Sequence, residues 1–243
     1  MTTTALGLRL PRRWTARHGG RLVVRLALYA IVAAIFLVPL WSMVATAFSA
    51  ADPKNGEVFL VPHGLSLAHL TTAWQLGMGR GLLNSLIVVT VGLTLQVTVS
   101  AFAAYALARK RFRGASLVLL ALLATMMMPE EVISIPLYLL IGRMRLLNTY
   151  PGLILPLSLP ALGTCAVFGF LMIWDQYLLP LLVVQTPGMN TLTLVVTGLA
   201  ASQEQGEGVR LAAAVVLMVP SILIYLGLQR LFERGLLSGS LKG

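Results

Sequence analysis

Side chains able to do chemistry are few in this sequence, and their spacing does not support catalysis. The three histidines, His18, His63 and His69, lie outside the apolar stretches, and Cys165 is the single cysteine. A lone cysteine excludes disulfide frameworks and clustered-cysteine zinc sites. The sequence has no P-loop, HExxH, GxSxG or paired-cysteine motif. It therefore offers no pattern for ATP binding, and none for a catalytic, metal or cofactor site.

One acidic residue, Asp175, lies deep in an apolar stretch, in the sequence Trp174-Asp175-Gln176-Tyr177. An ionisable side chain within a membrane span is costly and usually faces a water-filled pathway or a partner. Trp and Tyr also concentrate at the membrane–water interface, where the carboxylate would lie among headgroups. Both interpretations stay open, and these four residues are the candidate pathway or partner-facing group.

The elements that must position these residues are long apolar segments. The chain is 58% hydrophobic and 11% charged, with a mean hydropathy of +0.87, whereas soluble domains carry about 25% charged residues. Apolar runs at 26–48, 83–107 and 211–228 approach or exceed the roughly 20 residues that a helix needs to span a bilayer. A shorter run covers 116–129. We therefore predict an all-α integral membrane protein, a polytopic bundle of about five to six transmembrane helices.

Basic residues predict the orientation of these spans. Thirteen of the 18 Lys and Arg residues lie in the N-terminal arm at 1–25, the loop at 109–113 and the tail at 229–243. Lys and Arg beside spans favour the cytoplasm, so both termini are expected there and the segment 49–81 outside. The net charge of +10 fits contact with anionic lipid headgroups. No basic stripe is interleaved with aromatics, so nucleic acid is not an expected partner.

The apolar stretch 151–184 does not fit a simple span. Its 34 residues exceed one crossing, yet two helices and a turn need about 40 or more. The chain is expected outside at Glu130 after three crossings, and the basic tail is expected inside. The stretch must then enter and leave the membrane on the same side, as a cramped hairpin.

A shorter amphipathic region precedes that stretch. Glu130 and Glu131 are expected to end the third span, and Pro136 to open an apolar helix of about 12 residues that ends with Arg143 and Arg145. A helix of that length is too short to span the bilayer. We expect it to lie in the outer interface or to dip back into the membrane.

Several short motifs occur together in an order and at spacings typical of one family. They are Asn84-Ser85 at the start of the second span, the run 101–108 before a basic loop, Ile135-Pro136-Leu137-Tyr138, Leu147-Asn148-Thr149, 174–180, and the ending Arg234-Gly235-Leu236 with Gly239 and Lys242-Gly243. Together they resemble the inner-membrane permease subunit of binding-protein-dependent ABC importers, in the maltose-type branch for carbohydrate and glycerol-phosphate uptake. The resemblance covers nearly the whole chain.

The resemblance implies a six-helix type I importer permease at 26–243, a multi-pass protein of the bacterial plasma (inner) membrane. It implies a heterodimer with a second permease subunit, two cytoplasmic ATPase subunits and an extracytoplasmic solute-binding protein. ATP hydrolysis would belong to the ATPase subunits, so this chain would be no enzyme and would hold no cofactor. Sugar is the expected solute, with glycerol phosphate as the alternative.

The chain departs from this family at 153–159 (LILPLSL). Members carry a cytoplasmic loop between the fourth and fifth helices, where a coupling helix marked by Glu-Ala-Ala docks onto the ATPase. No Glu-Ala-Ala occurs here, and no hydrophilic loop lies between Asn148 and Gln185. The expected starts of the fourth and fifth helices share Leu-Pro-Leu. This pattern indicates an internal deletion that truncates the fourth helix and merges it with the fifth.

Two groups of residues match family positions. Residues 174–177 correspond to the outer part of the fifth helix, where Trp-Asn is commoner than Trp-Asp. The candidates for cytoplasmic tail contacts are Gly235, Gly239, Lys242 and Gly243. The missing coupling loop leaves a non-transporting membrane scaffold or assembly partner as the alternative function. The lack of a polar catalytic cluster within the spans argues against a membrane enzyme.

Overall fold

The computed structural model describes residues 15–54, 57–110, 112–126, 129–158, 166–202 and 204–240. In these residues the backbone is helical apart from loops, and extended pairing is limited to an isolated bridge between Ser49 and Leu65. The elements are α1 (Thr15–Ala47), α2 (Ala68–Ala73), the π-helix η1 (Trp74–Met78), α3 (Gly79–Arg109), α4 (Ala115–Met126), α5 (Glu130–Arg143), α6 (Tyr150–Ser158), α7 (Ala166–Trp174), α8 (Leu178–Val183), the 3₁₀-helix η2 (Pro187–Met189), α9 (Leu192–Ala201) and α10 (Glu207–Ser240).

The predicted all-α membrane class is confirmed. Three helical segments of the described chain are long and apolar enough to cross a membrane, namely Leu22–Ala47, Ala68–Arg109 and Glu207–Gly227. They coincide with the three long predicted spans. The last helix, α10, continues to Ser240, so the backbone of the predicted tail is helical up to that residue.

The region around the paired acids differs from the prediction. The acids do not end the preceding helix, because α4 ends at Met126 and α5 begins at Glu130. Pro136 does not open the second helix but lies inside it. Pro129 is extended, with φ −60° and ψ 138°, and carboxylates in a first turn are favoured by the positive end of the helix dipole. These local preferences start α5 six residues before Pro136.

The apolar stretch 151–184 forms three short helices, of which the first two, α6 and α7, begin and end at one level of the bundle. Tyr150, the first residue of α6, donates its hydroxyl to Asn84 Oδ1 at 2.7 Å. Trp174, the last residue of α7, accepts a 2.8 Å bond on its carbonyl from Thr193 Oγ1, close to where Leu192 N donates to Ser85 Oγ at 2.7 Å. Asn84 and Ser85 are neighbours in α3. The chain therefore returns to the end of α3 from which it departed, as the charge argument predicts.

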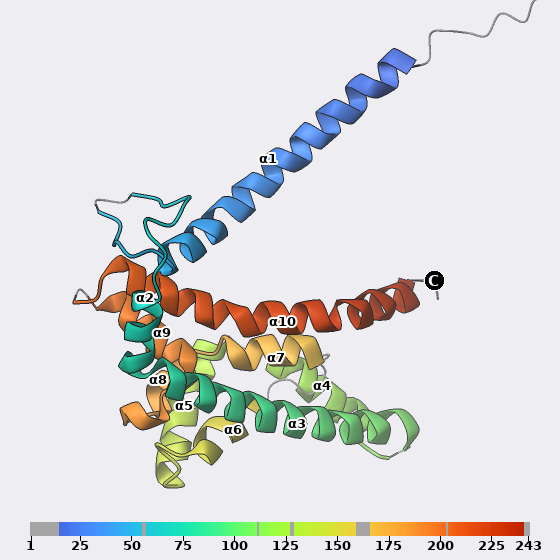
Figure 1. Ribbon diagram of the computed structural model, residues 1–243. Helices are drawn as coiled ribbons and strands as arrows, with labels where there is room; N and C mark the ends of the chain where they lie inside the picture. Colours follow the sequence, from blue (N-terminus) through green and yellow to red (C-terminus); the bar gives the residue numbers. More distant parts are fainter. Residues whose placement is uncertain are drawn as a thin grey trace, which may run out of the picture.

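Neither helix of this pair is long enough to span. Each has nine residues, which is about 14 Å at 1.5 Å per residue, against a hydrocarbon core about 30 Å thick. Both pack along α3 (Figure 1). Residues 159–165, which include Cys165 and the last position of the 153–159 junction, lie outside the described residues.

The packed core occupies one end of the bundle. The buried residues of α3 run from Gly81 to Gln96, and none of its described residues beyond Gln96 is buried. The contacts of α1 are confined to its C-terminal end, where Ala45 and Ala47 are 1% and 0% exposed. The rest of α1 leans away from the other helices (Figure 1). The described remainder of α1 and the part of α3 beyond Gln96 present exposed apolar side chains that only lipid or partner helices can cover.

In its described residues the segment 49–81 is a loop followed by α2 and η1, with extended pairing limited to the bridge between Ser49 and Leu65. The Ser49 hydroxyl accepts a bond from His63 N at 3.0 Å, and Ala50 N donates to Gly64 O at 2.9 Å. These bonds close a compact loop at the end of α1. α2 and η1 follow and run directly into α3, with a break in helical geometry at Gly77, where φ is +101°.

Candidate functional site

Trp174 lies in the core of the bundle. Its side chain is 2% exposed, and its Nε1 donates to the carbonyl of Leu217 in α10 at 3.2 Å. The indole stacks on Phe170, with ring centroids 5.5 Å apart and planes inclined by 18°. Through Thr193 it also contacts the first turn of α9. Trp174 therefore joins α7, α9 and α10, with its ring buried within the chain, and a pathway or partner role for it stays a prediction.

The other three candidates lie in the break between α7 and α8. Asp175 and Tyr177 have exposed side chains, while Gln176 is half-buried. Asp175 N still donates to Leu171 O at 2.9 Å, so the helix ends directly after Trp174. Pro180 does not interrupt α8. It lies in the first turn of this helix, where a missing N–H leaves no hydrogen bond unmade. A pathway or partner role for Asp175, Gln176 and Tyr177 stays a prediction.

A polar network that we call the loop clamp lies at the same end of the bundle. It consists of Arg80, Asn84 and Ser85 of α3, together with Asn148 and Tyr150 before and at the start of α6. These side chains hold the loop between α8 and α9. Because the loop lies more than 100 positions from α3 in sequence, its placement depends on these contacts.

Asn84 is the centre of the loop clamp. It is 2% exposed, and its Nδ2 donates to Gly188 O at 3.1 Å and to Asn190 O at 2.7 Å. Its Oδ1 accepts the Tyr150 hydroxyl at 2.7 Å. Arg80 Nε adds a 2.9 Å bond to Gly188 O. The Asn84 side chain thus satisfies both its donor and its acceptor, which a buried amide requires.

Asn148 fixes the other side of the same loop. Its Oδ1 accepts bonds from Gln185 N and Thr186 N, each at 3.2 Å, and from Thr186 Oγ1 at 3.0 Å. Its backbone N donates to Val183 O at 2.8 Å. The residue has φ +55°, a left-handed conformation that Asn tolerates better than most side chains. Both the amide group and the backbone conformation favour Asn at this position.

The sequence identified two parts of the loop clamp only as family motifs. Asn84-Ser85 and Leu147-Asn148-Thr149 carry the resemblance, but their role as backbone-binding side chains comes from the structure. The sequence feature that indicates this role is an amide side chain at the end of an apolar span, because a buried polar group needs a hydrogen-bond partner. The partner itself, the backbone near Gly188, has no side chain that marks it.

A second polar contact joins the 49–66 loop to α10. Asp52 Oδ1 accepts the backbone N–H of Gly208 at 2.7 Å, which places a carboxylate at the start of α10, where the helix dipole favours it. His69 Nε2 lies 3.9 Å from Asp52 Oδ1, and the His69 side chain is buried against Gly208. The contact closes the end of the bundle between α2 and α10.

The candidate tail contacts lie at the opposite end of α10. Gly235 and Gly239 belong to its last turns, and Lys242 and Gly243 fall outside the described residues. Among the residues that the structure describes, no group of three or more His, Cys, Asp or Glu side chains could hold a metal ion. The tail roles stay predictions.

The fold is that of an ABC importer permease. The chain superimposes on the crystal structure of a bacterial ABC transporter involved in the import of the acidic polysaccharide alginate, with a TM-score of 0.71 over 90% of this chain and 99% of that one. Sequence identity with that structure is 17%, so the likeness concerns the fold. No family model matches the chain.

Curated relatives place the sequence more narrowly. The probable ABC transporter permease protein YurM of Bacillus subtilis is 25% identical, covering 96% of this chain and 91% of the relative. The diacetylchitobiose uptake permease NgcG of Streptomyces coelicolor is 27% identical over 84% of this chain, and the sn-glycerol-3-phosphate permease UgpE of Salmonella typhi is 28% identical over 84%. These relatives confirm the predicted resemblance to permease subunits of the carbohydrate and glycerol-phosphate importers.

The alignments also show that the relatives contain positions that this chain lacks. The match to the Bacillus protein runs over 277 positions, whereas this chain has 243 residues. At least 34 positions of that relative therefore have no counterpart here.

Proposed function

We propose that this chain is the permease subunit of an ATP-driven, binding-protein-dependent importer for sugars or related solutes. The observation that carries the proposal is the match of fold and sequence along nearly the whole chain to such permeases. Glycerol phosphate is the alternative solute, because one similar relative is named for it. A non-transporting scaffold is the less favoured function.

The proposed assembly follows from that role. This chain would form a heterodimer with a second permease subunit in a bacterial plasma membrane, with both termini cytoplasmic. Two separate ATPase subunits would hydrolyse ATP on the cytoplasmic side, and a solute-binding protein would deliver solute from outside. The chain would itself catalyse no reaction. The polar loop clamp would then lie on the side from which solute arrives.

The proposal includes impaired coupling. Allosteric coupling needs a physical element whose state both sites bias. α6 and α7 begin and end at one level of α3, and the described part of each, nine residues, is too short to reach the other side. The basic loop near Arg109–Gly114 is too short to replace a docked helix. We infer that closure of the ATPase subunits has no route into this chain's helices through the usual loop.

Uptake of labelled solute tests both parts in cells that lack the native permease but supply all partners. The 243-residue chain should give no ATP-driven uptake above background, and reinserting a family-type coupling loop after Leu157 should restore some. Robust ATP-dependent uptake by the chain as it stands would contradict the coupling argument. If neither form transports, although both reach the membrane and co-purify with the second permease, the scaffold function is supported instead.

A further inference from the structure

The segment between α1 and α3 exposes several large apolar side chains. Val61 is 71% exposed and Leu65 is 86% exposed in the loop, and Leu67 and Trp74 follow at 58% and 56% on the helical part. From Val58 to Gly79 the sequence has no Asp, Glu, Lys or Arg. Contiguous apolar patches of this kind mark a surface that something covers.

The apolar loop is held beside a membrane-spanning helix. Trp41 Nε1 of α1 donates to Leu60 O at 2.8 Å, and the loop lies next to the C-terminal end of α1 (Figure 1). Trp41 precedes the end of α1 at Ala47 by six residues, about 9 Å along the axis. Leu60 and its neighbours therefore lie level with a turn of α1 that belongs to its apolar span.

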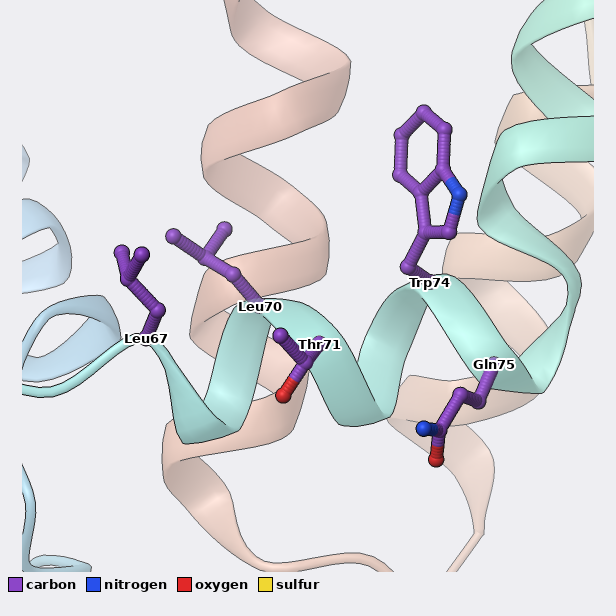
Figure 2. A pocket seen from close by; sticks show the side chains of 5 residues that line it. All are labelled: Leu67, Leu70, Thr71, Trp74 and Gln75. Atoms are coloured by element: carbon purple, nitrogen blue, oxygen red, sulfur yellow. The ribbon is translucent and has the colours of Figure 1, made fainter.

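The helical part presents its apolar side chains on one face. Leu67, Leu70 and Trp74 follow the three- and four-residue spacing of a helix, and Figure 2 shows them on one side, with Thr71 and Gln75 on the other. The five side chains line an open pocket of about 430 Å³. Past the break at Gly77 the chain continues into α3, and Ala68–Arg109 as a whole is long and apolar enough to cross a membrane.

We propose that residues 58–76 form a lipid-anchoring surface, whose exposed apolar side chains insert among the acyl chains of the leaflet at the C-terminal end of α1. Three observations select lipid as the occupant: the level of Leu60 beside α1, the absence of charge from Val58 to Gly79, and continuity with a membrane span. Trp74 adds an exposed indole, a side chain that is enriched at membrane–water interfaces. The inference is independent of which solute is transported and of which way the chain faces.

Fluorescence quenching in phosphatidylcholine nanodiscs tests the surface on the full chain. Single cysteines replace Val61, Leu65 and Leu67 in a Cys165→Ala background and carry an environment-sensitive label. Gln185→Cys, in the exposed polar loop after α8, is the matched control. We expect blue-shifted emission at the three positions and quenching by lipid carrying a doxyl group near the headgroup that is several-fold stronger than at position 185. Iodide in the water should show the opposite order.

Two outcomes would overturn the proposal. Iodide quenching at Val61, Leu65 and Leu67 as strong as at Gln185 would show that water covers the surface. Protection from both quenchers would show that protein, such as a second copy of the chain, covers it. A label-free measurement guards against distortion by the label: brominated lipid should quench the native protein more than a Trp74→Phe variant, and equal quenching would count against lipid contact.

Discussion

At the residue scale, one indole and one amide determine how the helices meet. Trp174 links α7 to the backbone of α10 and to the first turn of α9. Asn84 links α3 to the loop before α9 and to the start of α6. Both side chains are buried and use their polar atoms on backbone or on a neighbour's hydroxyl. Their loss should therefore lower stability through unmade hydrogen bonds as well as through lost packing.

Replacing Trp174 with Phe keeps an aromatic ring but removes the N–H that reaches Leu217 O. We expect the free energy of unfolding to fall by about 1 kcal/mol for the bond, and by about 3–5 kcal/mol for Trp174→Ala, which also leaves a cavity. Thermal unfolding of the purified protein in detergent micelles measures both. Trp74→Phe is the control, since Trp74 is exposed, and an equal loss in that variant would argue against a special role for Trp174.

Replacing Asn84 with Leu should be more damaging than replacing Tyr150 with Phe. The first change leaves the carbonyl of Asn190 and the Tyr150 hydroxyl without their partner, at about 1–3 kcal/mol for each group, while Gly188 O keeps its bond from Arg80 Nε. The second change removes a single bond. Thr98→Val is the control, because Thr98 is exposed and bonds only within its own helix. Unfolding in mixed micelles should rank the three variants in that order, and a neutral Asn84→Leu would refute the loop clamp.

At the scale of elements, the pair α6 and α7 depends on close approach of backbone to backbone. A Cβ at Gly152 would overlap the backbone carbonyl of Leu146, in the turn that joins α5 to α6. If the clashing atom belonged to a side chain, it could rotate to make room, but the carbonyl of Leu146 is held in place by the turn. The glycine therefore sets how α6 leaves the turn and docks against α3.

We expect Gly152→Ala to lower the free energy of unfolding by about 1–3 kcal/mol, as overpacking in a fixed core does. Gly198→Ala in α9 is the matched control, since nothing lies within 4 Å of the added Cβ. That change should be neutral or stabilising by roughly 0.5–1 kcal/mol, because Ala favours helix over Gly. Circular dichroism melts of both variants provide the comparison. Equal melting temperatures would mean that α6 has room at this position.

At the scale of the whole molecule, the core is confined to the end of the bundle that holds the loop clamp. There α1, α3, α7, α9 and α10 meet, together with α2 and the short helices. Toward the other end, α3 and α10 continue with few buried residues. This asymmetry is consistent with the proposed internal deletion, because in their described residues α6 and α7 together provide 18 residues beside α3.

The orientation of this asymmetric bundle follows from charge, and labelling tests it. We expect both termini to be cytoplasmic, because 13 of the 18 basic residues lie at the termini and in the 109–113 loop. In a Cys165→Ala background, Thr3→Cys and Leu241→Cys should resist an impermeant thiol reagent in intact cells, while Gln185→Cys should react. Reaction of either terminal cysteine from outside would reverse the topology.

The sequence by itself determined the membrane class, the three long spans and the family resemblance. Hydropathy and basic flanks are local properties, so segments such as Leu22–Ala47 and Glu207–Gly227 can be predicted without knowing their neighbours. The predicted start of α5 at Pro136 is wrong by six residues. Pro129 and the two acids after it favour a helix that begins at Glu130.

The tertiary structure decided what the apolar stretch 151–184 does and which candidate residues face inward. The sequence around Trp174 is typical of the membrane interface, but contacts with Thr193 and Leu217 bury this residue. The sequence identifies Asn84 only as part of a motif. Its role in holding the loop between α8 and α9 comes from hydrogen bonds to residues more than 100 positions away. Such contacts depend on how separate helices align in space. Local composition does not encode that alignment, because the stabilising free energy comes from hydrogen bonds between polar groups that lie together only in the folded chain.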